Sequence, residues 1–223
     1  DQANEVIQGE WGQSFMNDVG ENGIVRQLGM HCKGMRCSTN NVRELRTPSD
    51  AAGITFRVME NTVSIRMVEA MDAIATPMSG SEMYSALETG VVDGQENPVI
   101  NIVQDLTYEV QKYLTLDEHM AGFMAYIMNV DFYNNLPDDL KAVVDEGAAQ
   151  ATQAALDVVV NRSEECVQEL KDYGMQVYEP TAEEKAEWQQ VLFDGTVDYV
   201  RSVVGDEVIA GHLWEASLRT DGR

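Results

Sequence analysis

The feature that most constrains the fold is an alternation of short apolar strands with amphipathic helical segments between residues 54 and 98. Strand patterns at 54–59 and 74–78 are followed by helical patterns at 62–71 and 81–89. Strands and helices that alternate in this way are typical of a parallel α/β layer, because parallel neighbours need a crossover connection. The sequence therefore predicts an α/β fold.

The alternation ends in residues 91–98, which read VVDGQENP. We expect the two valines to form a short buried strand and the polar residues to form a tight turn before a new helix at Pro98. The proline also biases Asn97 toward extended backbone. Such a turn offers a small ligand backbone groups and the side-chain amide of Asn97.

The predicted strand at 54–59 contains an arginine. Its alternation divides the residues into two faces, Ile54, Phe56 and Val58 on one and Thr55, Arg57 and Met59 on the other. A guanidinium in an otherwise apolar strand is costly unless it is paired. The planar fork of Arg57 matches a ligand carboxylate. An internal ion pair with Glu60 or Asp93 is the alternative.

The charge of the chain restricts its partners. A formal net charge of -23 at pH 7 argues against nucleic acid, whose binding depends on the neutralisation of phosphates. Residues 26–66 are an exception, with seven basic and three acidic side chains. This local excess is either a solvated basic face or a set of arginines that converge on an anion.

The sequence shows no catalytic or metal-binding motif. The three histidines have no metal-ligand spacing, and we see no nucleophile motif, phosphate loop or convincing carboxylate pair. We therefore expect no enzyme, no cofactor and no metal. Cys32 and Cys37 are close enough in sequence to form a disulfide that leaves Cys166 single, but three thiols are equally allowed.

The remaining segments are predicted from periodicity and from helix caps. The expected helices lie at 6–19, 99–106, about 136–173, 181–204 and 207–218. The expected strands lie at 24–32, 35–39, 113–120, 123–130 and 176–178, with Gly34 as a turn and Gly122 as a break. Alanines in the middle of the longest helix predict close packing against another element.

Several of these motifs together resemble the periplasmic solute-binding subunits of TRAP transporters, the DctP type. The resemblance covers roughly residues 10–180 and is carried by residues 47–58, 76–78 (TPM), 82–87 (EMYSAL), 90–98 (GVVDGQENP), 108–114 (YEVQKYL) and 136–141 (LPDDLK). It implies a two-lobed periplasmic-binding-protein-like fold with a long lobe-spanning helix. The N-terminal part of the family's first lobe has no counterpart in this sequence.

The resemblance also implies a division of the chain. Residues 1–35 would end the first lobe and contain the crossover strand. Residues 36–120 would form the second lobe, with the arginine strand and the Gln-Glu-Asn-Pro turn. Residues 121–223 would supply the return strands, the long helix and the C-terminal helices.

The function implied is that of a periplasmic binding protein, not an enzyme, that captures a small organic acid and delivers it to a TRAP membrane permease. In the family, residues matching Arg57 and Asn97 bind the ligand carboxylate, and Arg36 matches a second arginine. Glu60 and His119 are further candidates for lining the ligand site, although a structural role is favoured for His119. The alternative is a ligand-sensing module that reports to a signalling partner.

Overall fold

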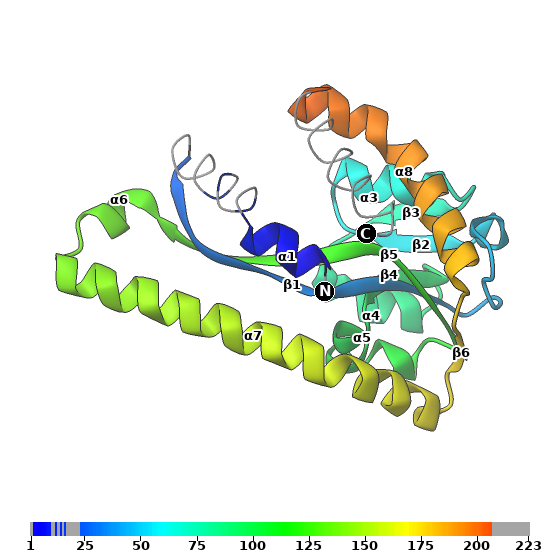
Figure 1. The fold of residues 1–223 in the computed structure, drawn as a ribbon. Helices are drawn as coiled ribbons and strands as arrows, with labels where there is room; N and C mark the ends of the chain where they lie inside the picture. The colour runs from blue at the N-terminus through cyan, green and yellow to red at the C-terminus, as the bar shows by residue number, and fades with distance from the viewer. Residues whose placement is uncertain (1, 10–11, 13, 15, 17–22, 207–223) are drawn as a thin grey trace. The chain divides into compact units, whose positions relative to one another are not determined.

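The computed structural model describes residues 2–9, 12, 14, 16 and 23–206 (Figure 1). Its helices are α1 (Gln2–Gln8), η1 (Pro48–Ala51), α3 (Thr62–Glu69), α4 (Gly80–Glu88), α5 (Val99–Gln104), η2 (Thr107–Glu109), α6 (Val130–Asn134), α7 (Asp138–Tyr173) and α8 (Ala182–Val204). Its strands are β1 (Val25–Asn40), β2 (Thr55–Val58), β3 (Ile74–Pro77), β4 (Gly94–Pro98), β5 (Tyr113–Asn129) and β6 (Gln176–Tyr178).

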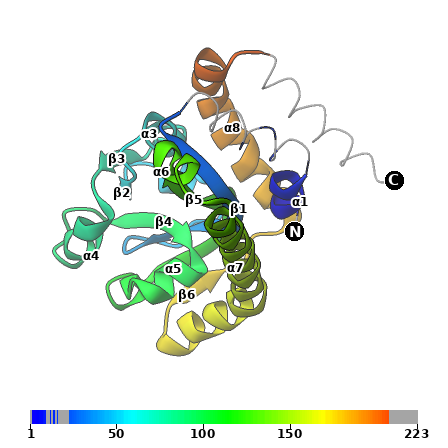
Figure 2. The ribbon, with the colours of Figure 1, turned by 90° about the vertical axis from the view of Figure 1, so that its left-hand side faces the viewer.

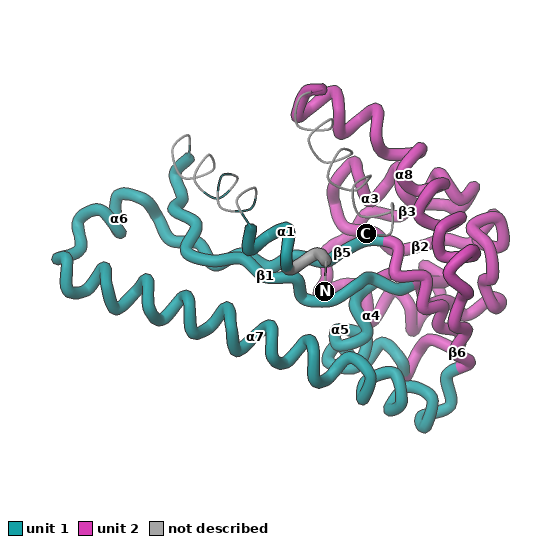
Figure 3. The backbone as a smooth tube through the Cα atoms, viewed as in Figure 1, with its two compact units in different colours: residues 1–37, 97–108, 120–175 teal, residues 38–96, 109–119, 176–223 magenta. Residues whose placement is uncertain are grey.

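The chain forms two compact units, each built from interleaved stretches (Figure 3). Unit 1 consists of Asp1–Cys37, Asn97–Tyr108 and Met120–Met175, and unit 2 of Ser38–Glu96, Glu109–His119 and Gln176–Arg223. The chain therefore passes between the units within β1, β4 and β5. The division into residues 1–35, 36–120 and 121–223 that the family resemblance implies stays a prediction.

Unit 2 contains the α/β layer that the strand–helix alternation predicts. One sheet has the strand order β3-β2-β4-β1-β5-β6, in which β2 pairs in parallel with both β3 and β4, and β5 with β6. The register places Arg57 opposite Thr76 and Phe56 opposite Gly94. The mixed α/β fold class is confirmed.

Helix α8 packs on α3 and η1 within unit 2. The approach to α3 is close, because a Cβ placed on Gly195 would lie only 2.4 Å from the Cβ of Ala70. The N-terminus of α8 is fixed by Thr181, whose side chain caps the backbone N–H of Glu184. The predicted start and end of this helix are confirmed.

Unit 1 is organised around α7, which packs against α5 near its C-terminal end (Figures 1 and 2). The expected close packing in the middle of α7 is present, since a Cβ on Gly29 of β1 would lie 2.5 Å from Oγ1 of Thr152. Gly174 ends the helix with a φ of 114°. All of α7 belongs to unit 1.

Two glycines that suggested interruptions lie inside continuous strands. Gly34 has a φ of 116° within β1, and Gly122 lies within β5. A Cβ on Gly122 would lie 3.3 Å from the carbonyl oxygen of Gly34, so the residues mark a close approach of two backbones. The predicted turn at Gly34 and the predicted break at Gly122 are wrong.

The Gln-Glu-Asn-Pro segment is also different from its prediction, because it is a strand and not a turn. All five residues of β4 are buried. The two valines before it form no strand, and Val91 is 64% exposed. Polar composition favoured a turn, but partners from other segments satisfy these polar side chains inside the protein.

Parts of the predicted N-terminal helix, including Trp11, Phe15 and Val19, and all of the predicted helix at 207–218 lie outside the described residues. In the described part of the chain, none of the helices combines the length and the apolar character needed to cross a membrane. Cys32, Cys37 and Cys166 are buried thiols, and burial raises the pKa of Cys32 and of Cys166.

Candidate functional site

Arg57 lies on β2 with its side chain directed to the β3–α4 connection. It is 6% exposed, and its Nε and Nη2 atoms donate hydrogen bonds of 3.1 and 2.9 Å to the carbonyl oxygen of Met78. Met78 is itself fixed, because its N–H donates to the carbonyl of Val58. Two bonds to one carbonyl set the plane of the guanidinium, whose charge persists at any physiological pH.

The start of α4 supports this arrangement. Ser79 and Glu82 form a capping box in which the Glu82 carboxylate accepts from the N–H and the hydroxyl of Ser79. The hydrogen bonds from Ser79 lower the pKa of Glu82. Gly80 follows, and a Cβ there would lie 3.8 Å from Nη2 of Arg57, so a side chain at this position would border the guanidinium.

The two carboxylates considered as internal partners of Arg57 have other surroundings. Asp93 accepts a hydrogen bond of 2.9 Å from the backbone N–H of Thr55. Glu60, just beyond β2, is exposed. Its role in lining a ligand site remains a prediction.

The side chain of Gln95 anchors β4 to β1 within unit 2. Gln95 is fully buried and donates to Oγ1 of Thr39 at 2.8 Å, and Thr39 donates to Gln111 at 2.8 Å. Gln111 in turn donates to the backbone carbonyls of Asp93 and Val110. This chain of hydrogen bonds explains how an amide side chain is accommodated in the interior.

His119 lies between two acidic residues in the interior of unit 2. Its Nδ1 is 3.0 Å from Oδ2 of Asp117, and its Nε2 is 3.5 Å from Oε2 of Glu96. The side chain of His119 is 2% exposed. Burial lowers the pKa of His119, but the charges of Asp117 and Glu96 and the close contacts with both carboxylates outweigh it and raise the pKa to about 9.

Two predicted site residues, Arg36 and Asn97, belong to unit 1. Arg36, on β1, is 4% exposed, and Asn97, on β4, is 8% exposed. Asn97 lies in a strand and therefore has an extended backbone, as expected for a residue that precedes a proline. A buried guanidinium and a buried amide are therefore present in unit 1, and a second buried guanidinium, Arg57, in unit 2.

The sequence analysis did not identify the groups that orient Arg57 and His119, which are the Met78 carbonyl and the Asp117 carboxylate. Met78 contributes only a backbone carbonyl, which leaves no signal in the sequence. Asp117 accepts hydrogen bonds from the N–H and the hydroxyl of Ser38, 79 positions earlier in the chain. An acidic residue two positions before a histidine on one predicted strand face is the only hint of this contact. No group of three or more potential metal ligands occurs among the described residues.

Comparison with known proteins identifies relatives for almost the whole chain. Residues 1–197 match the family described as bacterial extracellular solute-binding protein, family 7 (DctP). A C4-dicarboxylate-binding periplasmic protein DctP from Rhodobacter capsulatus is 34% identical over 209 residues, which are 92% of this chain and 61% of that protein. The chain thus spans less than two thirds of the length of this relative.

Solved structures of TRAP periplasmic solute-binding proteins share the fold. One from Desulfovibrio salexigens with bound orotic acid has a TM-score of 0.87 and 25% identity, over 96% of this chain and 69% of that chain. Another from Sulfurospirillum deleyianum with bound succinate has a TM-score of 0.83 and 29% identity, over 93% of this chain and 68% of that chain. The ligands in both structures are carboxylic acids.

Proposed function

Since the chain belongs to family 7 of the bacterial extracellular solute-binding proteins, the TRAP type, we propose that it binds a small organic acid through a carboxylate–guanidinium pair at Arg57. Asn97 donates a hydrogen bond to the same carboxylate, and Arg36 supplies a second positive charge. The protein works in the periplasm and delivers its ligand to a TRAP membrane permease. Glu60 and His119 are the remaining candidates for lining the site.

The observation that carries this proposal is the position of Arg57. The residue is buried, and its guanidinium plane is set by the Met78 carbonyl, which accepts from two of its nitrogens. A planar carboxylate can bind a guanidinium with two parallel hydrogen bonds, whereas an ammonium group offers only a point charge. The organic acids in the orotate and succinate structures support this ligand class.

Substitution of Arg57 tests the proposal. In Arg57→Ala the affinity for the acid should fall by about 2–5 kcal/mol, equivalent to tens to thousands of times, because a charge-assisted pair is removed from a dry site. Arg57→Lys keeps the charge and should restore only part of the affinity. Titration calorimetry with a panel of succinate, orotate, D-erythronate and galacturonate measures both variants.

Arg66→Ala is the matched control, because Arg66 is an exposed arginine on α3 of the same unit. It should bind the panel as the parent protein does. If Arg57→Ala retains the parent affinity for the acid that the parent binds, Arg57 is not the carboxylate-binding residue. The permease step is tested by uptake of that acid in cells that carry the permease, with and without the binding protein.

A further inference from the structure

The three strands that connect the two units share one buried polar cluster in unit 2. The cluster consists of Ser38 on β1, Glu96 on β4, and Asp117 and His119 on β5. Ser38, Glu96 and His119 are also the unit 2 residues at which these strands pass into unit 1. We name this group the strand-exit cluster.

The contacts of the strand-exit cluster join β1 to β5 through Asp117 and β5 to β4 through the imidazole of His119. Asp117 accepts from the N–H of Ser38 at 3.1 Å and from its hydroxyl at 2.7 Å, which joins β5 to β1. His119 Nδ1 lies 3.0 Å from Oδ2 of Asp117, the same oxygen that accepts from the Ser38 hydroxyl. His119 Nε2 lies 3.5 Å from Glu96, which joins β5 to β4.

The charge of the imidazole decides whether both contacts can exist. A neutral imidazole has one N–H donor, so only one of the two carboxylates could receive a hydrogen bond or a positive charge from it. The imidazolium has two N–H donors and attracts both carboxylates. Because Asp117, Glu96 and His119 have side chains at most 2% exposed, solvent does little to screen this attraction.

We propose that His119 is a positioning residue for the ligand site: as an imidazolium it holds Glu96 and thereby fixes the part of β4 that carries Asn97. This inference rests on the proposed function, in which Asn97 binds the ligand carboxylate. Glu96 and Asn97 are consecutive in the chain, so a change at one limits the backbone of the other. His119 then acts on the ligand through β4 and need not touch it.

The proposal predicts a dependence of affinity on pH. The pKa of His119 is raised from its usual range to about 9, so the imidazolium contacts are complete at pH 7 and are lost as the pH rises through 9. The titratable groups that face His119 are Asp117 on its own strand and Glu96 on β4.

Nuclear magnetic resonance of the full-length protein without ligand tests the positioning role independently of binding. The His119 ring signals should titrate with a midpoint near 9, and the backbone and side-chain amide signals of Asn97 should shift with the same midpoint. A His119 midpoint near 6.5, or Asn97 signals that do not follow His119, would overturn the proposal. Neither result depends on which acid the protein binds.

Titration calorimetry then tests the effect on the ligand, with the acid from the panel that the parent binds. Parent affinity should be constant from pH 6 to 8 and fall above 9. In His119→Gln the affinity at pH 7 should be about tenfold lower, as for the loss of one charged hydrogen bond, and the fall above pH 9 should be absent. An unchanged affinity and pH profile in His119→Gln contradicts the positioning role.

Two further variants keep the test decisive. His31→Gln is the matched control, because His31 is a buried histidine on β1 in unit 1 outside the cluster, and its profile should follow the parent. Glu96→Gln removes the carboxylate on β4 and serves as the test variant if His119→Gln does not fold. In Glu96→Gln the Asn97 signals should no longer follow the titration of His119. If no acid of the panel binds the parent protein, the proposed function fails while the resonance measurement still decides the positioning role.

Discussion

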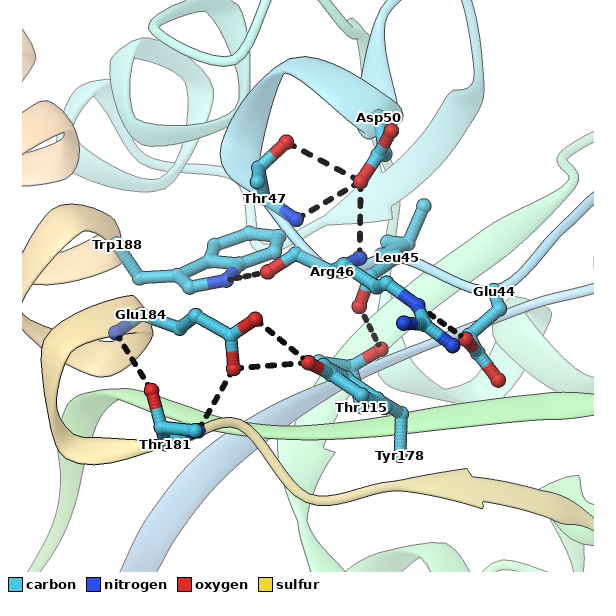
Figure 4. Close-up of polar contacts among 10 residues, drawn as sticks. All are labelled: Glu44, Leu45, Arg46, Thr47, Asp50, Thr115, Tyr178, Thr181, Glu184 and Trp188. Atoms are coloured by element: carbon cyan, nitrogen blue, oxygen red, sulfur yellow. Dashed lines mark hydrogen bonds and ion pairs between the residues drawn. The ribbon is translucent and has the colours of Figure 1, made fainter.

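Replacement of Trp188 tests how α8 is held in unit 2. The Trp188 side chain is fully buried, and its Nε1 donates to the carbonyl oxygen of Arg46 at 3.2 Å (Figure 4). The neighbouring carbonyl of Leu45 accepts from Oγ1 of Thr115 on β5 at 2.9 Å. The loop before η1 is therefore attached to α8 on one side and to β5 on the other.

The size of the effect follows from these contacts. Trp188→Phe keeps an aromatic ring but loses a hydrogen bond, which leaves the Arg46 carbonyl with a desolvation cost of about 1–3 kcal/mol. The smaller ring also leaves unfilled volume. Because a complete truncation of a buried tryptophan to alanine costs about 3–5 kcal/mol, we expect Trp188→Phe to lower the free energy of unfolding by about 2–3 kcal/mol.

Urea denaturation followed by far-ultraviolet circular dichroism measures this change as a lower midpoint with an unchanged slope. Phe193→Ala is the control, because Phe193 is a large aromatic residue on the same helix that is 41% exposed. It should change the free energy of unfolding by less than about 1 kcal/mol. Equal losses in the two variants would refute the role assigned to the Trp188 contact.

Three other substitutions test the structure: two glycine replacements should change the free energy of unfolding with opposite signs, and one aspartate replacement should change its pH dependence. In Gly94→Ala the new Cβ would lie 2.4 Å from the carbonyl oxygen of Thr39, so the free energy of unfolding should fall by about 1–3 kcal/mol or more. Gly147→Ala, in the open on α7, should raise it by up to about 1 kcal/mol in the same denaturation assay. Burial raises the pKa of Asp50, but hydrogen bonds from Thr47 and Arg46 outweigh burial and lower this pKa overall. The ionised Asp50 therefore stabilises the folded protein above about pH 4, and this contribution is lost as the pH falls through the pKa of the folded state. Asp50→Asn should flatten the acid side of the stability profile, and a parallel profile would contradict this assignment.

Local signals in the sequence predicted the structure correctly where the groups that determine an element's boundary lie within the same segment. The end of α7 was predicted correctly from Gly174, because a left-handed residue at this position is a local property of the chain. Thr181 likewise marks the start of α8 through its own capping box. In both cases the groups that determine the boundary lie within one or two helical turns of it.

Local signals failed where distant segments decide the structure. Residues 94–98 have the composition of a turn, yet they form the buried strand β4 because Gln95 and Glu96 find partners on β1 and β5. The same limitation applies to the candidate site. The sequence singled out Arg57 as an arginine within an otherwise apolar strand, but the Met78 carbonyl that orients it could not be predicted from residue types.

The net negative charge of the protein and the negative charge of the proposed ligand repel each other. A chain with a net charge of -23 repels an approaching carboxylate, but this field is screened over about 10 Å at an ionic strength of 0.1 M. Arg57 is 6% exposed, so its attraction acts at short range where solvent screens little. If Arg57 binds the acid as proposed, the net charge should act mainly on how fast the acid arrives, and the buried guanidinium on how long it stays. The proposed positioning of β4 by His119 would belong to the second effect, because it would change the geometry of the bound state and not the field outside the protein.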